Sequence, residues 1–196
     1  EGDSDLSGSN ANSFSPPTST GGLLLRAQIL YQTPPEPEPE PEDIPCLTKD
    51  CEILTVNGYQ KVSSLNVGDK VVNSNNEHVK ITDIYKNEFI LTEKNKPYKI
   101  PRNYYGRNKP NKDIYLSKNH IYIGSKQWRT AKMDNLPREW NEPTITYYNI
   151  KLEDYYKDYL VVNNLIMESW DGLEPEEERD YIWKKSSKGL KMVIKK

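Results

Sequence analysis

The chain has 196 residues, with 27 Lys plus Arg against 29 Asp plus Glu, and its net charge of −2 gives no bulk attraction to nucleic acid or to a membrane surface. Only 35% of the residues are hydrophobic and the mean hydropathy is −0.88, which is too polar for the whole chain to pack around one core. No apolar run approaches the roughly 20 residues that a membrane helix requires. We therefore expect a partly folded chain without a membrane span.

The first 45 residues differ in composition from the rest. They hold eight acids, one base and eight of the fourteen prolines, and residues 34–42 begin with Pro-Pro and then alternate Glu with Pro. Such a segment cannot bury enough apolar surface to offset its chain entropy, so residues 1–45 are expected to be a disordered Pro/Glu-rich flank. Because the chain begins with Glu1 rather than Met, we expect a fragment or a processed piece.

From residue 46 to residue 170 the sequence is typical of a compact all-β body. Short β-branched runs alternate with Asn-Gly, Gly-Asp and Asn-Asn turns, and Asn57-Gly58 suits a tight hairpin. Two similar stretches, 62–69 and 130–136, each follow a turn and suggest a weak internal duplication. The predicted strands are Ile53–Val56, Lys70–Val72, a strand marked by Val79, Ile81 and Ile84, Ile114–Leu116, Ile121–Ile123, Thr144–Leu152, Tyr159–Val162 and Leu165–Met167.

Residues 171–196 form a C-terminal extension with a separated charge pattern. Three consecutive Glu (176–178) precede Lys184, Lys185 and Lys188, which suits the dipole of a helix. The pattern predicts a short helix over residues 175–188, docked on the β body.

Cys46 stands where the flank ends and the β body begins. Its thiol is placed to attack the carbonyl of the Pro45–Cys46 peptide bond, which would convert an amide into a thioester. This step requires near-attack geometry, a donor for the tetrahedral intermediate and an acid for the departing amine. Two cysteines are too few for a disulfide framework or a four-ligand metal site. Cys51 is expected to be a core residue, with a thiol that locks Cys46 on oxidation as the alternative.

Histidine is the natural acid near neutral pH, and the chain has two. His120 follows Ser117 by three residues, so that the Ser117 hydroxyl can hold the scissile amide while the imidazole serves its nitrogen. His78 lies in a polar loop beside Glu77 and is expected to be a solvated strand end. The candidate catalytic residues are therefore Cys46, Ser117 and His120.

Three blocks in this order resemble the Hint domain family, the self-processing modules shared by hedgehog proteins and inteins. The stretch 46–58, continued by Val62, Leu65 and Gly68–Val71, resembles the first block, and Ser117–His120 resembles a variant of the T-x-x-H block. Residues 144–169 resemble the last block. The residue pattern of the three blocks is most similar to that of Hint-like domains of bacteria and large DNA viruses, whose last block commonly ends in Glu-Ser or Glu-Thr.

The resemblance implies an all-β, horseshoe-like fold with pseudo-twofold symmetry, formed by residues 46–170. It implies that Cys46 attacks backwards and that the polypeptide ending at Pro45 leaves, so that the partner is the chain's own upstream segment in cis. Water or a small nucleophile would resolve the thioester, and no metal or cofactor is implied. Glu168-Ser169 replaces the His-Asn that ends an intein, so no splicing is expected.

Two further departures concern the first junction. Asn149 occupies a place where many members have Asp, which leaves the activation of an incoming nucleophile by a carboxylate in doubt. Pro45 precedes the nucleophile where a small residue is common, and its ring limits how the acyl group rotates. The alternative hypothesis is a Hint fold that no longer cleaves and acts as a structural or attachment module of a larger protein.

A different class of function is suggested by residues 94–112, which hold seven bases and no acid, interleaved with Tyr98, Tyr104 and Tyr105. Bases and stackable rings together are typical of single-stranded nucleic-acid binders, although a solvated loop has the same composition. Eighteen Asn, with abundant Lys, Ile and Tyr, favour an A/T-rich coding genome and hence a viral, virion-associated protein. The compartment itself is not determined by the sequence.

Overall fold

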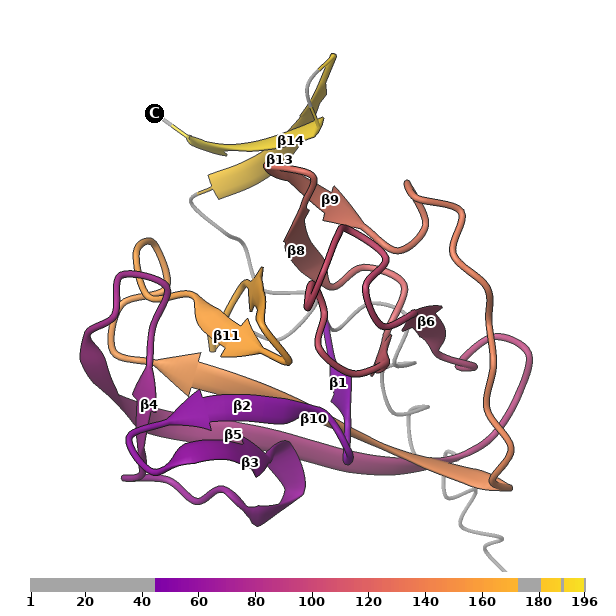
Figure 1. Cartoon of the computed structure of the whole chain (residues 1–196), viewed down its shortest axis with the longest axis horizontal. Helices are drawn as coiled ribbons and strands as arrows, with labels where there is room; N and C mark the ends of the chain where they lie inside the picture. The colour runs from indigo at the N-terminus through magenta and orange to yellow at the C-terminus, as the bar shows by residue number, and fades with distance from the viewer. Residues whose placement is uncertain (1–44, 173–180, 188, 196) are drawn as a thin grey trace, which may run out of the picture. The chain divides into compact units, whose positions relative to one another are not determined.

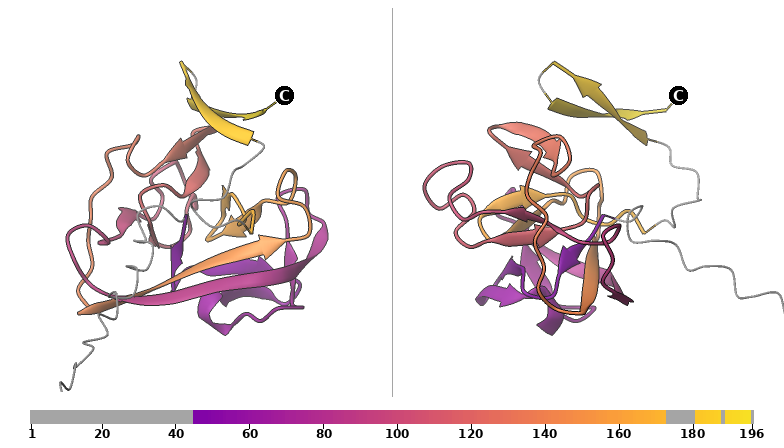
Figure 2. Two further views of the ribbon diagram at one scale, coloured as in Figure 1. Left: turned by 180° about the vertical axis from the view of Figure 1, so that it is seen from behind. Right: turned by 90° about the vertical axis from the view of Figure 1, so that its right-hand side faces the viewer.

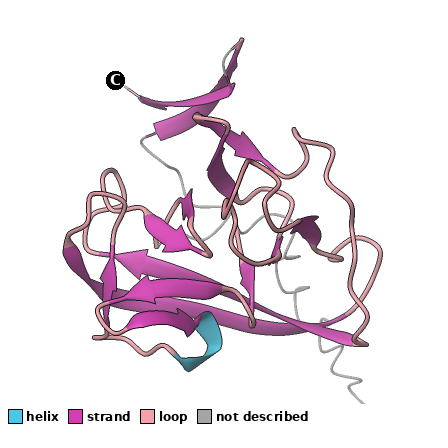
Figure 3. Cartoon of the chain, in the orientation of Figure 1, coloured by secondary structure: helices cyan, strands magenta, loops and turns pink. Residues whose placement is uncertain are grey.

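The computed structural model describes residues 45–172, 181–187 and 189–195 (Figure 1). The predicted disordered flank lies outside these residues except for Pro45. Within them the single helical segment is a 3-10 turn, η1 (Val62–Ser64), and all other regular structure is strand (Figure 3). The all-β prediction is therefore confirmed. None of the described helical structure is long or apolar enough to span a membrane.

Fourteen strands form one continuous hydrogen-bonded sheet in the order β13-β14-β9-β8-β12-β11-β2-β4-β5-β10-β1-β7-β6, with β3 paired to β2. The first seven strands are β1 (Leu47–Thr48), β2 (Glu52–Thr55), β3 (Gly58–Lys61), β4 (Lys70–Val72), β5 (His78–Ile90), β6 (Tyr98–Ile100) and β7 (Ile114–Leu116). The last seven are β8 (Ile121–Gly124), β9 (Gln127–Thr130), β10 (Thr144–Leu152), β11 (Leu160–Val162), β12 (Leu165–Met167), β13 (Tyr181–Ser186) and β14 (Gly189–Ile194).

The two longest strands, β5 and β10, pair antiparallel along almost their whole length and lie side by side in both orientations (Figures 1 and 2). The two segments that lead into them are built alike. The β2–β3 hairpin is followed by residues 62–69 and the short strand β4 before β5, and the β8–β9 hairpin is followed by residues 130–136 before β10, with no strand in between. The weak duplication in the sequence therefore has a structural counterpart, as a pseudo-twofold arrangement requires.

Turn chemistry explains the first hairpin. Thr55 pairs with Gly58 across a two-residue loop, and Gly58 takes a φ of 95°, which is accessible to glycine at little cost. The predicted hairpin is thus confirmed. His78 is exposed at the start of β5, as expected.

Buried side chains form two clusters on opposite faces of β1 and β10. Leu47 and Tyr148 belong to the main core, whereas Cys46 and Tyr147 belong to a second, smaller cluster with Ile145. Successive residues of a strand point to opposite faces, so the side chain of Cys46 is directed away from the main core. The candidate nucleophile therefore lies in the smaller buried cluster and not in the main core.

The predicted C-terminal helix is wrong for its described part. Residues 181–186 and 189–194 form an antiparallel hairpin, and β14 pairs with β9 at Leu190 and Trp128. Tyr181, Ile182 and Trp183 favour a strand, and the Trp183 ring lies 5.5 Å from that of Trp128. The pairing of β13 with β14, the pairing of β14 with β9 and the contact between the two Trp rings together stabilise the hairpin, whereas a helix dipole contributes only about 0.3–1 kcal/mol, so tertiary contacts override the charge pattern.

Candidate active site

The junction between Pro45 and Cys46 is held by the loop after β7. The Cys46 amide donates to the Ser117 hydroxyl oxygen at 2.8 Å, and the Ser117 amide donates to the Cys46 carbonyl oxygen at 2.9 Å. The pairing of Leu47 with Leu116 in β1 and β7 sets this register, because the next pair along the two strands is Cys46 with Ser117. The Ser117 hydroxyl therefore contacts the Cys46 amide, as expected from the sequence, and its catalytic role stays a prediction.

His120 is completely buried and lies beside the Pro45 backbone carbonyl. Burial lowers the pKa of its imidazole from 6.5 to about 3, and the contact with the Pro45 carbonyl opposes part of that lowering. Within the described part of the chain, neither ring nitrogen has a well-formed hydrogen bond. The ring is therefore neutral at physiological pH and contacts the carbonyl of the Pro45–Cys46 bond.

The thiol of Cys46 is also completely buried, and burial raises its pKa well above the ordinary value. Its neighbour Tyr147 donates its hydroxyl to the Asn95 carbonyl at 2.8 Å and so offers no charge to the sulfur. Cys46 therefore carries a neutral thiol next to a junction whose buried imidazole is also neutral, and thiolate formation requires a proton acceptor.

Asn149 joins this group from β10. Leu47 pairs with Tyr148, so the next position along β1 brings Cys46 opposite Asn149. Asn149 is 1% exposed, and its side-chain NH2 group has no partner among the described residues. The sequence marked this position only as a departure from a family pattern, because the register of β1 against β10 cannot be read from either strand alone.

The segment after β12 completes the surroundings. The Glu168 amide donates to the Ile121 carbonyl at 3.0 Å, and the Glu168 carboxylate accepts from the Ile121 amide at 2.9 Å and from the Tyr155 hydroxyl at 3.0 Å. The Trp170 amide donates to the Ile150 carbonyl at 2.6 Å. Glu168 thus fixes the residue next to His120, a role that sequence analysis missed because the carboxylate is far from Ile121 in the chain.

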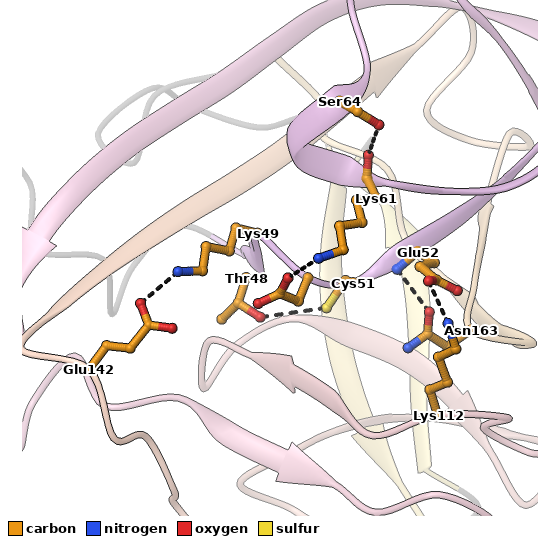
Figure 4. Close-up of polar contacts among 10 residues, drawn as sticks. Thr48, Lys49, Cys51, Glu52, Lys61, Ser64, Lys112, Glu142 and Asn163 are labelled. Carbon is orange, nitrogen blue, oxygen red and sulfur yellow. Dashed lines mark hydrogen bonds and ion pairs between the residues drawn. The ribbon is translucent and has the colours of Figure 1, made fainter.

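Cys51 lies in the main core, away from the cluster that contains Cys46. Its thiol donates to the Tyr115 carbonyl at 3.3 Å and lies 3.7 Å from the Thr48 hydroxyl (Figure 4). Because the two thiols occupy opposite faces of the sheet, the structure favours the core residue over the locking thiol. Both cysteines are free.

The sequence profile of the Hint domain family matches residues 45–171. The chain belongs to the Hint domain family. The match begins at the residue before Cys46 and ends just after Trp170, so it includes the Pro45–Cys46 bond, which is the first junction, and the segment at Glu168 and Ser169, which is the second junction, and it excludes the β13–β14 hairpin. The Hint domain belongs in general to self-processing proteins, which agrees with the resemblance found in the sequence.

Solved structures similar to this chain include inteins. The gp41-1 intein is 14% identical over 64% of this chain and 99% of its own, with a TM-score of 0.45. The MchDnaB-1 intein is 10% identical over 63% of this chain and 99% of its own, with a TM-score of 0.47. The bacterial intein-like domain from Clostridium thermocellum is 14% identical over 63% and 97%, with a TM-score of 0.45. The comparison with curated proteins found no match.

Part of the basic segment 94–112 is already neutralised within the Hint domain. Lys99 forms ion pairs with Asp113 at 3.1 Å and Glu139 at 2.9 Å, and Lys112 pairs with Glu52 at 2.5 Å. Binding of nucleic acid by this segment stays a prediction. Among the described residues, no group of three or more His, Cys, Asp or Glu side chains is arranged to hold a metal ion.

Proposed function

We propose that this Hint domain cleaves its own backbone between Pro45 and Cys46 by an N-to-S acyl shift. The observation that supports this proposal is that both ends of the Pro45–Cys46 peptide bond are contacted by candidate catalytic residues. The Cys46 N–H donates to the Ser117 hydroxyl at 2.8 Å, and His120 lies beside the Pro45 carbonyl. A structural histidine would be expected to have well-formed hydrogen bonds at both ring nitrogens, whereas within the described chain the contact of the buried His120 ring is with the carbonyl of the bond proposed to break.

The first step forms a bond between the Cys46 sulfur and the Pro45 carbonyl carbon. His120, which is neutral, takes the thiol proton, and the electron pair of the carbonyl moves to its oxygen. The negative oxygen then raises the pKa of the adjacent imidazole, because opposite charges in a buried site stabilise each other. His120 gives the proton to the Cys46 nitrogen, the C–N bond breaks, and a thioester remains.

Water or an added thiol then attacks the thioester and releases residues 1–45, leaving a free amine on Cys46. The second junction keeps its bond, since Glu168 and Ser169 supply no side chain that can cyclise onto the backbone as a terminal Asn does. We therefore expect one cleavage and no splicing, with residues 46–196 remaining one chain.

The test is the intact mass of the purified chain over time, with and without dithiothreitol, beside a Cys46→Ala variant. Release of residues 1–45 from the wild type, faster in thiol and absent in Cys46→Ala, is the expected result. An unchanged mass in thiol, with Cys46 shown to be reduced, would reject autoprocessing. The non-cleaving structural or attachment module would then be the better account of this domain.

A further inference from the structure

Six buried side-chain atoms have no well-formed hydrogen bond among the described residues, and three of them belong to two residues at the first junction. These are the ring nitrogens of His120, whose imidazole also lies against the Pro45 carbonyl, and the side-chain nitrogen of Asn149; a fourth, the hydroxyl oxygen of Ser169, belongs to the second junction. Unpaired buried polar atoms are rare in folded proteins because each costs free energy, and they are commonly retained where they do chemistry. The acyl shift proposed above assigns a role to His120 but none to Asn149.

The orientation of the Asn149 side chain is fixed by its own backbone. The Ile150 amide donates to the Asn149 side-chain oxygen at 3.0 Å. Only the oxygen end of a carboxamide can accept this hydrogen bond, so the NH2 end is the free end. That NH2 group carries two donors and no acceptor within the described chain.

The position of Asn149 follows from the sheet. Asn149 shares a face of β10 with Ile145 and Tyr147, which pack in one cluster with Cys46. The register of β1 against β10 brings Asn149 opposite Cys46 itself. The free NH2 group therefore lies on the face of the sheet that carries the nucleophile.

Two backbone donors at the junction already have acceptors other than the Pro45 carbonyl. The Cys46 amide donates to Ser117, and the Ser117 amide donates to the Cys46 carbonyl rather than to that of Pro45. The acyl shift nevertheless develops a full negative charge on the Pro45 oxygen in a buried site, where a preoriented donor is most effective. An unpaired NH2 group on this face meets that need.

We infer that the Asn149 side-chain amide donates a hydrogen bond to the oxyanion that forms at the Pro45 carbonyl. This inference rests on the proposed cleavage and adds a catalytic residue to it. Asn149 thereby acts as a donor and not as a substitute for a carboxylate base. It stabilises the tetrahedral intermediate while His120 holds the proton, and it transfers no proton itself.

Two substitutions distinguish Asn149 as a hydrogen-bond donor from the alternative that position 149 merely lacks a carboxylate base. Asn149→Asp keeps the shape but replaces the NH2 group with a carboxylate oxygen that cannot donate when ionised, and Asn149→Ala removes the donor without adding charge. Each is expected to slow dithiothreitol-induced release of residues 1–45 by about 100-fold, the loss typical of one oxyanion donor. Urea unfolding of each variant establishes that it is folded under the assay conditions.

Asn87→Asp is the matched control. Asn87 lies on β5, and its side-chain oxygen accepts from the following amide, Glu88, at 2.9 Å, the same local contact that Asn149 makes. It pairs with Tyr147 rather than with Cys46. Its substitution is expected to leave the release rate within about twofold of the wild type.

The outcomes distinguish the inference from the function on which it rests. Slow release by both folded Asn149 variants, with normal release by wild type and Asn87→Asp, supports the donor. Normal or faster release by Asn149→Asp or Asn149→Ala overturns the donor and leaves the cleavage intact. Release by Asn149→Asp alone, with an inert wild type, would show that the site lacks a base and would also overturn the donor. No release by any variant rejects both proposals.

Discussion

The two junctions of this Hint domain differ in how their buried polar side chains are paired. At the first, the imidazole of His120 contacts only the Pro45 carbonyl and the side-chain NH2 group of Asn149 has no partner among the described residues. At the second, the Glu168 carboxylate accepts two hydrogen bonds and the flanking amides of Glu168 and Trp170 are both paired, so that only the Ser169 hydroxyl lacks a partner among the described residues. Unpaired groups destabilise a fold but are free to act on a reacting bond, whereas paired groups stabilise it.

The comparison implies that chemistry belongs to the first junction and structural support to the second. It also gives Glu168 a definite place in that support. By accepting from the Ile121 amide, the Glu168 carboxylate fixes the chain directly after His120, so the second junction supports the position of the imidazole at the first. The predictions below test this division of roles, beginning with the largest expected effect.

Loss of the imidazole should almost abolish cleavage. His120→Ala removes the group that accepts and returns the proton, and general acid–base catalysis of this kind contributes about 10²- to 10⁴-fold. Thiol-induced release of residues 1–45, followed by intact mass, should fall by at least about 10²-fold. His78→Ala is the control, because His78 is exposed at the start of β5. Equal rates for His120→Ala and the wild type would place the chemistry elsewhere.

Truncation of the paired carboxylate should act mainly on stability. Glu168→Ala leaves the Ile121 amide and the Tyr155 hydroxyl without their acceptor, and each buried group left unpaired costs about 1–3 kcal/mol. We expect the free energy of unfolding in urea to fall by about 2–4 kcal/mol. Glu168→Gln retains two acceptor lone pairs and should lose about half as much. If Ala and Gln cost the same, the charge rather than the hydrogen bonding of Glu168 supports the second junction.

The buried imidazole should also make the domain sensitive to acid. The pKa of His120 is about 3 in the folded chain and near 6.5 when unfolded, so between these values the unfolded state binds more protons. Stability is therefore complete above about pH 6.5 and is lost as the pH falls toward 3. At pH 4.5, two units below the unfolded pKa, the loss from this group is about 2–3 kcal/mol.

The measurement compares wild type with His120→Gln by urea unfolding at pH 7 and pH 4.5. Carboxylates titrate in both proteins, so their contribution cancels in the difference and that of His120 remains. The wild type should lose about 2–3 kcal/mol more than the variant. An equal loss of unfolding free energy in the two proteins would mean that the imidazole of the folded domain takes up a proton as easily as that of the unfolded chain. The burial of His120 would then not distinguish the first junction from the second.

Local sequence signals were sufficient for much of this fold. Lys70–Val72, Ile114–Leu116, Thr144–Leu152 and Leu165–Met167 have the predicted ends, because β-branched runs bounded by turn residues define a strand without reference to its partners. The block pattern likewise identified Ser117 as the residue that contacts the Cys46 amide. Both depend on features within a few residues of each other or on a motif.

Features that depend on strand register could not be predicted in the same way. Asn149 and Glu168 were recognised only as departures from the family pattern, and their surroundings become evident when β1 meets β10 and β12 meets β8. The C-terminal extension was assigned a helix because its charges suited a dipole, whereas Trp128, more than fifty residues earlier, supplies the contact that favours a strand. Distant partners therefore decided the positions where sequence analysis was incomplete or wrong.

The smallest predicted effect concerns the β13–β14 hairpin, which lies beyond the family match. Trp183 packs against Trp128 at 5.5 Å between ring centroids, and an aromatic pair contributes about 0.5–1.5 kcal/mol beyond its buried area. Trp183→Ala should lower the free energy of unfolding by about 1–3 kcal/mol and keep one cooperative transition, since β14 continues the same sheet through β9. Ile182→Ala, at a residue 39% exposed, should change the free energy of unfolding by less than about 0.5 kcal/mol.

Cleavage rates of the two variants should agree within about twofold, because the hairpin contacts neither the Pro45 carbonyl nor Cys46. An unchanged free energy of unfolding in Trp183→Ala would show that the hairpin does not stabilise the rest of the domain. Slower cleavage by this variant would show that the hairpin, like Glu168, helps to hold the Pro45–Cys46 junction in place.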